Sequence, residues 1–195
     1  LIISSDHGDW AGDYGLVEKW PSALDDTMTR VPLLLRVPGG AEGHVVNEPV
    51  ELMDLMPTVL ELGGLEAKHT HFARSLVPQI TGDPGDRDRA VYCEGGYDPH
   101  EPHAFEGRAE SGGLFRDRNH IYYPKGLQQQ EVPESVCRST MLRTLDYKLI
   151  RRTNGMNELY DMREDPRELH NLYENPELFD VRYALESRML NWYIH

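Results

Sequence analysis

Short apolar runs separated by loops dominate the first third of the chain. Residues 1–4 and 31–35 each have the pattern of an apolar strand, and residues 50–62 place most apolar side chains on one helical stripe. Apolar strands beside an amphipathic helix are typical of an α/β sheet covered by helices. We therefore expect the two strands to be buried neighbours in one sheet, flanked by the helix.

The pattern changes after residue 82, where a polar stretch containing Pro84 and Gly85 has the character of a crossover. A short strand is predicted at residues 89–93. Residues 94–130 show little periodicity and are rich in Gly, His, Pro and charged residues. A loop of that length is uncommon unless it lines a site, so this stretch is a candidate for substrate recognition.

The last third of the chain predicts a small antiparallel sheet with one helix, an α+β unit. Residues 139–144 and 147–152 have the pattern of two strands joined by a tight turn, and residues 157–161 add a short third strand. Residues 180–194 carry apolar side chains at helical spacing. We expect this closing helix to pack on one face of the sheet.

Composition narrows the function classes. The chain is 39% hydrophobic and 27% charged, and no apolar run approaches the roughly 20 residues that a membrane helix needs. A net charge of −13 argues against nonspecific nucleic-acid binding. It permits an anionic substrate, because a bound metal and a few cations can reverse the local field. The two cysteines, Cys93 and Cys137, are expected to be unpaired thiols.

The tetrapeptide Ser5-Asp6-His7-Gly8 is the strongest candidate site. It directly follows an apolar strand, where open α/β sheets place their ligands. Asp6 can offer a carboxylate oxygen and His7 an imidazole nitrogen to one metal ion, and Gly8 lets the backbone turn away. The alternative for the tetrapeptide alone is a turn-capping aspartate beside a surface histidine.

Further motifs follow this tetrapeptide in a fixed order, and together they resemble the sulfatase family of the alkaline phosphatase superfamily. In the first half the matching segments are Gly15-Leu16 with Lys19, Val31-Pro32-Leu33, Pro38-Gly39 and Asp54-Leu55-Met56-Pro57-Thr58. In the second half they are Leu142-Arg143-Thr144, Tyr147-Lys148-Leu149-Ile150, Glu158-Leu159-Tyr160-Asp161, Asp165-Pro166, Glu168-Leu169 and Asn171-Leu172. The resemblance is weakest over residues 94–136.

The resemblance implies a site for sulfate ester hydrolysis. Asp6 and His7 match a pair of metal ligands, and Lys19 matches a lysine that contacts the sulfate oxygens, acting in both substrate binding and catalysis. The implied metal is Ca²⁺, whereas an imidazole ligand suits Mn²⁺ or Zn²⁺ better. The metal-binding atoms of Asp6 and His7 should then lie within about 5 Å of each other. The ammonium group of Lys19 should face them, and the substrate should be a small-molecule or carbohydrate sulfate ester.

Two departures from the family pattern matter. Tyr14 stands where family members often have histidine, and neither Cys93 nor Cys137 lies in the Cys/Ser-x-Pro/Ala-x-Arg motif that matures to the formylglycine nucleophile. The chain also begins without Met inside a predicted strand. We expect the nucleophile, the remaining metal ligands and any targeting signal to lie upstream, so that this part of the protein is inactive alone. Alternatives are a phosphodiesterase or phosphonate monoester hydrolase of the same superfamily, or a non-catalytic pseudoenzyme.

His100 and His103 form a second candidate region, as substrate-binding residues in a loop over the active-site mouth. The flanking prolines argue against a helix. A flexible acidic loop and a separate zinc site are the alternatives.

With the family resemblance, residues 1–82 are expected to be the C-terminal part of an alkaline-phosphatase-like catalytic α/β sandwich. Residues 83–138 are then the loop and crossover region, and residues 139–195 the small α+β subdomain.

Overall fold

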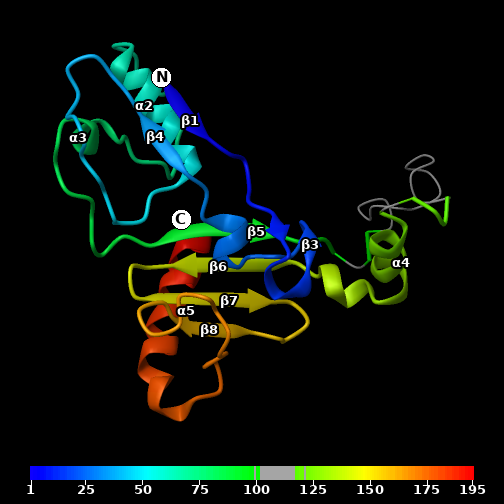
Figure 1. The fold of residues 1–195 in the computed structure, drawn as a ribbon. Helices are drawn as coiled ribbons and strands as arrows, with labels where there is room; N and C mark the ends of the chain where they lie inside the picture. Colours follow the sequence, from blue (N-terminus) through cyan, green and yellow to red (C-terminus); the bar gives the residue numbers. More distant parts are fainter. Residues whose placement is uncertain (99, 102–116, 121) are drawn as a thin grey trace.

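The computed structural model describes residues 1–98, 100–101, 117–120 and 122–195 (Figure 1). No helix in these ranges is long and apolar enough to cross a membrane. The elements in chain order are β1 (Ile2–Ser4), β2 (Trp10–Ala11), η1 (Asp13–Gly15), β3 (Val17–Glu18), α1 (Asp26–Thr29), β4 (Leu33–Leu35), η2 (Leu52–Asp54), α2 (Leu55–Leu62), α3 (Val77–Ile80), β5 (Val91–Gly95), α4 (Tyr123–Glu131), η5 (Pro133–Val136), β6 (Ser139–Arg143), β7 (Tyr147–Arg152), β8 (Glu158–Asp161), η6 (Pro176–Leu178) and α5 (Phe179–Ile194).

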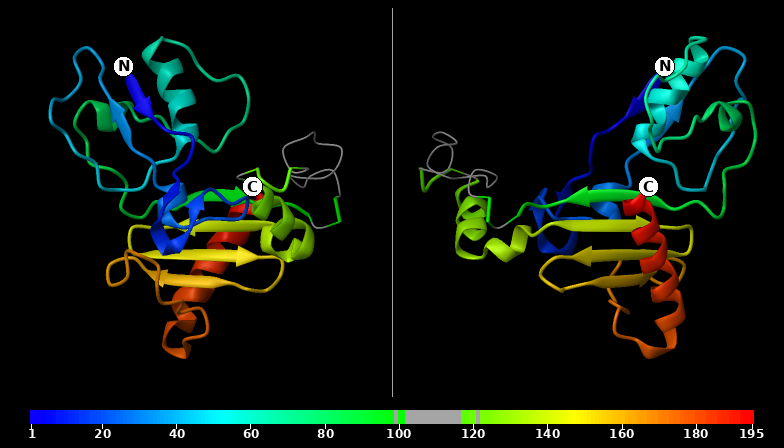
Figure 2. Two further views of the ribbon diagram at one scale, coloured as in Figure 1. Left: turned by 45° about the vertical axis from the view of Figure 1, so that its right-hand side comes forward. Right: turned by 180° about the vertical axis from the view of Figure 1, so that it is seen from behind.

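The strands β1 and β4 are neighbours, as predicted, and pair in an antiparallel sheet with Ile3 opposite Leu34. The helix α2 lies beside them in Figure 1 and in the two further views of Figure 2. The expected burial of these strands is wrong for this chain, because Ile3 is 51% exposed and Leu34 58% exposed. Within the described residues only these two strands pair in this sheet, so much of their apolar surface stays open to solvent.

A four-stranded antiparallel sheet in the order β5-β6-β7-β8 forms the second part of the molecule. The predicted strands at residues 139–144, 147–152 and 157–161 are confirmed, with Leu142 opposite Leu149 in the central pair. The predicted strand at residues 89–93 is also present, two residues later, as β5. Because β5 pairs with β6, the sheet includes a strand from outside the predicted C-terminal unit of residues 139–195. The three-part division of the chain stays a prediction.

Both faces of this sheet are buried. On one face, Leu142, Leu149 and Leu159 form a cluster with Leu185 and Met189 of α5, which confirms that the closing helix packs on the sheet. Figure 2 shows α5 crossing that face. The opposite face is lined by the alternate strand residues and is covered by the segment that contains α1. Its buried cluster consists of Leu24, Met141, Ile150, Tyr160 and Met162.

The short helices α1 and α3 and the longer helix α4 were not predicted. The prediction of no regular structure over residues 94–130 is wrong where α4 lies. Its sequence is polar apart from Leu127 and its N-terminal tyrosine, and it contains Gly126. It therefore lacks the apolar stripe by which an amphipathic helix is recognised. Pro124 in its first turn is a helix-start signal, since the missing N–H has no intrahelical partner at that position.

A buried ion pair joins the first part of the chain to the four-stranded sheet. Asp54, at the start of α2, is fully buried, and Arg89, just before β5, is nearly so. The two carboxylate oxygens of Asp54 lie 2.8 and 2.9 Å from the guanidinium nitrogens of Arg89. They also accept hydrogen bonds from the backbone N–H groups of Glu51 and Arg74. The Asp-x-x-Pro-Thr segment therefore has a structural role here.

We predict that Asp54→Ala destabilises the full-length protein by about 3–5 kcal/mol, because it removes the bidentate partner of a buried guanidinium. Urea denaturation measures the change. The matched control is Asp86→Ala, which removes an exposed ion pair with Arg74 and should cost about 0–1 kcal/mol. Equal losses of unfolding free energy in the two variants would contradict the stabilising role of the buried Asp54–Arg89 ion pair.

Candidate functional site

The segment that follows β1 brings three polar side chains together. The Oδ2 atom of Asp6 lies 3.7 Å from Nε2 of His7, and Nζ of Lys19 lies 3.2 Å from the same nitrogen. These distances agree with the arrangement expected from the sequence. The side chains of Asp6 and His7 are 85% and 41% exposed, and Lys19 is also exposed, so all three groups are accessible to a ligand.

A backbone contact fixes the tautomer of His7. Its Nδ1 atom lies 2.7 Å from the carbonyl oxygen of Gly8, which can only accept a hydrogen bond. Nδ1 therefore carries the proton, and Nε2 presents its lone pair to the Lys19 ammonium group. A metal-binding histidine is oriented in the same way, by a hydrogen bond from its second nitrogen to a carbonyl or carboxylate.

Local hydrogen bonds also hold the carboxylate of Asp6. Its Oδ1 atom accepts from the backbone N–H of His7 at 3.0 Å, and this contact is the main cause of a lowered Asp6 pKa. The hydroxyl of Ser5 donates to the carbonyl oxygen of His7 at 2.7 Å and so braces the same turn. Asp6 therefore stays ionised, with Oδ2 directed towards His7.

Gly8 holds this turn against α1. Its backbone N–H donates to the carbonyl oxygen of Met28 at 2.8 Å. A Cβ atom at this position would lie 1.8 Å from the carbonyl oxygen of Thr27, so no other residue fits without moving one of the two segments. The position of His7 therefore depends on the position of α1.

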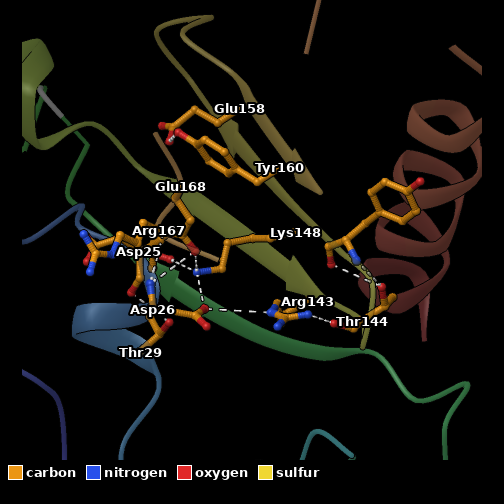
Figure 3. Close-up of polar contacts among 12 residues, drawn as sticks. Asp25, Asp26, Thr29, Arg143, Thr144, Lys148, Glu158, Tyr160, Arg167 and Glu168 are labelled. Carbon is orange, nitrogen blue, oxygen red and sulfur yellow. Dashed lines mark hydrogen bonds and ion pairs between the residues drawn. The ribbon is translucent and has the colours of Figure 1, made fainter. Parts of the chain in front are cut away.

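The helix α1 is in turn held by a buried lysine from the four-stranded sheet (Figure 3). Lys148 of β7 is fully buried, and its Nζ atom lies 2.6 Å from Oδ1 of Asp26 and 3.0 Å from the carbonyl oxygen of Leu24. It also contacts the carboxylate of Glu168, which accepts from the backbone N–H of Asp26 at 3.1 Å. We call Lys148, Asp26 and Glu168 the buried lysine cluster.

Burial makes Glu168 the titrating member of this cluster. Removal from water raises its pKa to about 7, and the nearby Lys148 ammonium opposes the rise without cancelling it. Because this value lies above the ordinary 4.5, the folded protein retains a proton that the unfolded chain has already released. The stability from this group is therefore fully present below about pH 4.5 and is lost as the pH rises to about 7.

We predict that Glu168→Gln flattens the pH dependence of stability between about pH 4.5 and about pH 7. Thermal melts of the full-length protein across this range measure the effect. Exposed Glu164 provides the control, since Glu164→Gln should leave the slope of the wild-type curve unchanged. An unaltered slope in the Glu168 variant would show that this carboxyl does not titrate in that range.

A cleft of about 1150 Å³ contains all three of the site residues in its lining. Much of the remaining lining is apolar and comes from β4, the segment before α2, and the four-stranded sheet; it includes Leu33, Leu35, Val46, Leu52, Val91 and Met141. His100 is exposed in a turn after β5 and is not among the described residues that line this cleft. His103 lies outside the described residues.

The donor set is chemically suited to a divalent ion. One carboxylate oxygen and one imidazole nitrogen 3.7 Å apart can each reach a shared ion at about 2–2.6 Å. Four or more ligands are needed for a tight site, and no group of three or more His, Cys, Asp or Glu side chains in the described part of the chain is arranged to hold a metal. The metal-ligand roles of Asp6 and His7 stay a prediction.

Sequence reasoning did not find the buried lysine cluster. A usable signal was present in the strands, where consecutive apolar residues such as Leu149-Ile150 indicate burial on both faces. A lysine inside a strand buried on both faces requires carboxylate partners. Asp26 lies more than 100 residues away, and Glu168 lies 20 residues away in an irregular segment, so the pattern alone could not identify them.

Two family profiles match the chain. The sulfatase profile matches residues 1–65, and the profile of the C-terminal region of N-sulphoglucosamine sulphohydrolase matches residues 101–194. The chain belongs to the sulfatase family and corresponds to the C-terminal portion of its members. This confirms the resemblance seen in the motifs.

The relatives show how much of such a protein this chain represents. It is similar to an uncharacterized sulfatase YidJ of Escherichia coli, with 31% identity over 98% of this chain and 31% of that protein. It is also similar to an N-acetylglucosamine-6-O-sulfatase of Bacteroides thetaiotaomicron, with 26% identity over 91% of this chain and 27% of that protein. The chain thus spans about a third or less of the length of these relatives.

A solved structure supports the fold. The phosphonate monoester hydrolase of Silicibacter pomeroyi superposes with a TM-score of 0.73 at 25% identity, over 99% of this chain and 34% of that one. The mixed α/β architecture expected from the sequence therefore matches structures of the alkaline-phosphatase-like sulfatase group.

Proposed function

We propose that this chain supplies part of the active site of a sulfuric ester hydrolase. In this proposal Asp6 and His7 bind a divalent metal, and Lys19 donates to the oxygens of the sulfate group. The observation that carries the proposal is the convergence of the Lys19 ammonium and the Asp6 carboxylate on one nitrogen of His7, at 3.2 and 3.7 Å. Membership of the sulfatase family gives this geometry its chemical meaning.

The lone pair on Nε2 of His7 links metal binding by His7 to ester binding by Lys19. Nε2 has a single lone pair, so His7 cannot accept from Lys19 and ligate a metal at the same time. As a metal ligand it would leave the Lys19 ammonium available for an ester oxygen. The four-carbon stem of lysine lets this charge follow the changing geometry of the leaving sulfuryl group.

A divalent metal bound at Asp6 and His7 would neutralise negative charge on the ester and polarise its oxygens. The family resemblance favours Ca²⁺, while the imidazole ligand suits Mn²⁺ or Zn²⁺. The remaining ligands and a formylglycine nucleophile would come from a part of the protein outside these 195 residues. This chain alone is therefore expected to be inactive, and the region of His100 and His103 remains a proposed substrate contact.

The proposed substrate is a sulfate ester, on a small molecule or a carbohydrate. The similarity to an N-acetylglucosamine-6-O-sulfatase supports a carbohydrate sulfate. A second candidate is phosphonate monoester hydrolysis, which the similarity to the Silicibacter pomeroyi enzyme favours. Both substrates are anionic esters, so the same metal ligands and the same lysine would serve either one.

We predict that Lys19→Ala in the full-length enzyme lowers kcat/KM by about 10²–10³-fold, the scale of losing one preorganised transition-state donor. The melting temperature should change little, because Lys19 lines an open cleft and contributes little to the core. Kinetics on an aryl sulfate and on a phosphonate monoester would measure the effect on both candidate reactions.

Lys68→Ala serves as the control, since Lys68 is exposed in the loop after α2. A Lys19→Ala enzyme with full activity on the preferred ester would contradict the role of Lys19. A wild-type protein inactive on both esters would instead favour a non-catalytic member of the family.

A further inference from the structure

The two chain neighbours of Lys19 are both tied to the segment that contains α4 and η5. On one side, Oε2 of Glu18 lies 3.5 Å from Nζ of Lys125, whose side chain is largely buried. On the other side, the indole N–H of Trp20 donates to the carbonyl oxygen of Ser135 at 2.7 Å. Lys19 is thus held between two contacts with a segment more than 100 residues further along the chain.

The backbone conformation of Glu18 links its ion pair with Lys125 to the position of Lys19. Glu18 ends the short strand β3, where it pairs with Trp10, and its φ of +66° lies in the left-handed region that L residues rarely adopt. Such a residue turns the chain sharply and so sets the direction in which the next residue, Lys19, leaves the strand. A non-glycine residue stays in this conformation only when its surroundings hold it there.

The α4 region surrounds the carboxylate of Glu18. Lys125 supplies an opposite charge, and the proximity of the Glu18 carboxylate raises the pKa of Tyr122. The ammonium of Lys125 also lies 6.0 Å from the centre of the Tyr122 ring, so the two side chains are close neighbours. The Glu18 side chain is therefore held by a contact from the α4 region, outside the β2–β3 hairpin.

We propose that Lys125, through its ion pair with Glu18, is a positioning residue for Lys19. This inference rests on the proposed function, in which Lys19 donates to the ester during the reaction. Lys125 itself acts through the backbone turn at Glu18, which keeps the Lys19 ammonium beside the Asp6 and His7 side chains, within reach of an ester bound there.

Loss of the ion pair should affect turnover more than substrate binding. Mispositioning of a transition-state donor by about 1 Å costs on the order of 10²-fold in rate, whereas ground-state binding of the ester is shared with other groups. We therefore expect Lys125→Met in the full-length enzyme to lower kcat by about 10–100-fold with a smaller change in KM. Lys125→Arg, which keeps the charge, should recover most of the lost kcat.

The decisive measurement is the same substitution in a Lys19→Ala background. If Lys125 acts through Lys19, adding Lys125→Met to Lys19→Ala should lower kcat no further. Glu18→Gln should likewise add little to Lys125→Met. The matched control is Lys68→Met, which removes an exposed lysine of the same size and should leave kcat unchanged.

Two results would overturn the inference. One is a Lys125→Met enzyme with the kcat of the Lys68→Met control, and the other is an equal loss in the wild-type and Lys19→Ala backgrounds. If the wild-type protein hydrolyses neither ester, the proposed function fails, and the placement of Lys19 is then tested by its acetylation rate, followed by mass spectrometry. Lys125→Met should alter that rate at Lys19, and an unchanged rate would contradict the positioning role.

Discussion

The burial of one ammonium group is the constraint on which the candidate site depends. Lys148 on β7 has no exposure to solvent, so it needs the Asp26 carboxylate, the carboxyl group of Glu168 and the carbonyl oxygen of Leu24 to offset the loss of hydration. Asp26 begins α1, and α1 is the element against which Gly8 is closely packed. A continuous series of contacts therefore runs from the centre of the C-terminal sheet to the imidazole of His7.

The second buried ion pair, between Asp54 and Arg89, also joins the first part of the chain to the four-stranded sheet. It joins α2 to the strand β5, as the lysine cluster joins α1 to β7. Both pairs connect the first part of the chain to the four-stranded sheet. An apolar contact could hold these parts together, but directional hydrogen bonds with fixed partners also define one orientation. The proposed metal and substrate site lies next to α1, so a defined orientation of the two parts would also fix its geometry.

Elements and motifs that depend on residues close together in the sequence could be predicted. Short apolar runs bounded by turns identified β6, β7 and β8, helical spacing identified α5, and the motifs placed Asp6, His7 and Lys19 close together. The exposure of β1 and β4 could not be predicted, because the apolar pattern of a strand does not show whether other residues of the same chain pack against it. The polar helix α4 lacks an apolar stripe, and the partners of Lys148 and Lys125 lie more than 100 residues away or in an irregular loop.

The buried lysine cluster also bears on the order in which the chain folds. The hairpins β6–β7 and β7–β8 close over short turns, whereas the pairing of β5 with β6 spans residues 96–138. Loop-closure entropy therefore favours formation of the two hairpins first. Until the segment with Asp26 docks, the Lys148 side of this early sheet keeps a hydrated charge among its apolar residues. That charge disfavours premature collapse on this face, so the face should stay open until its native carboxylate partners arrive.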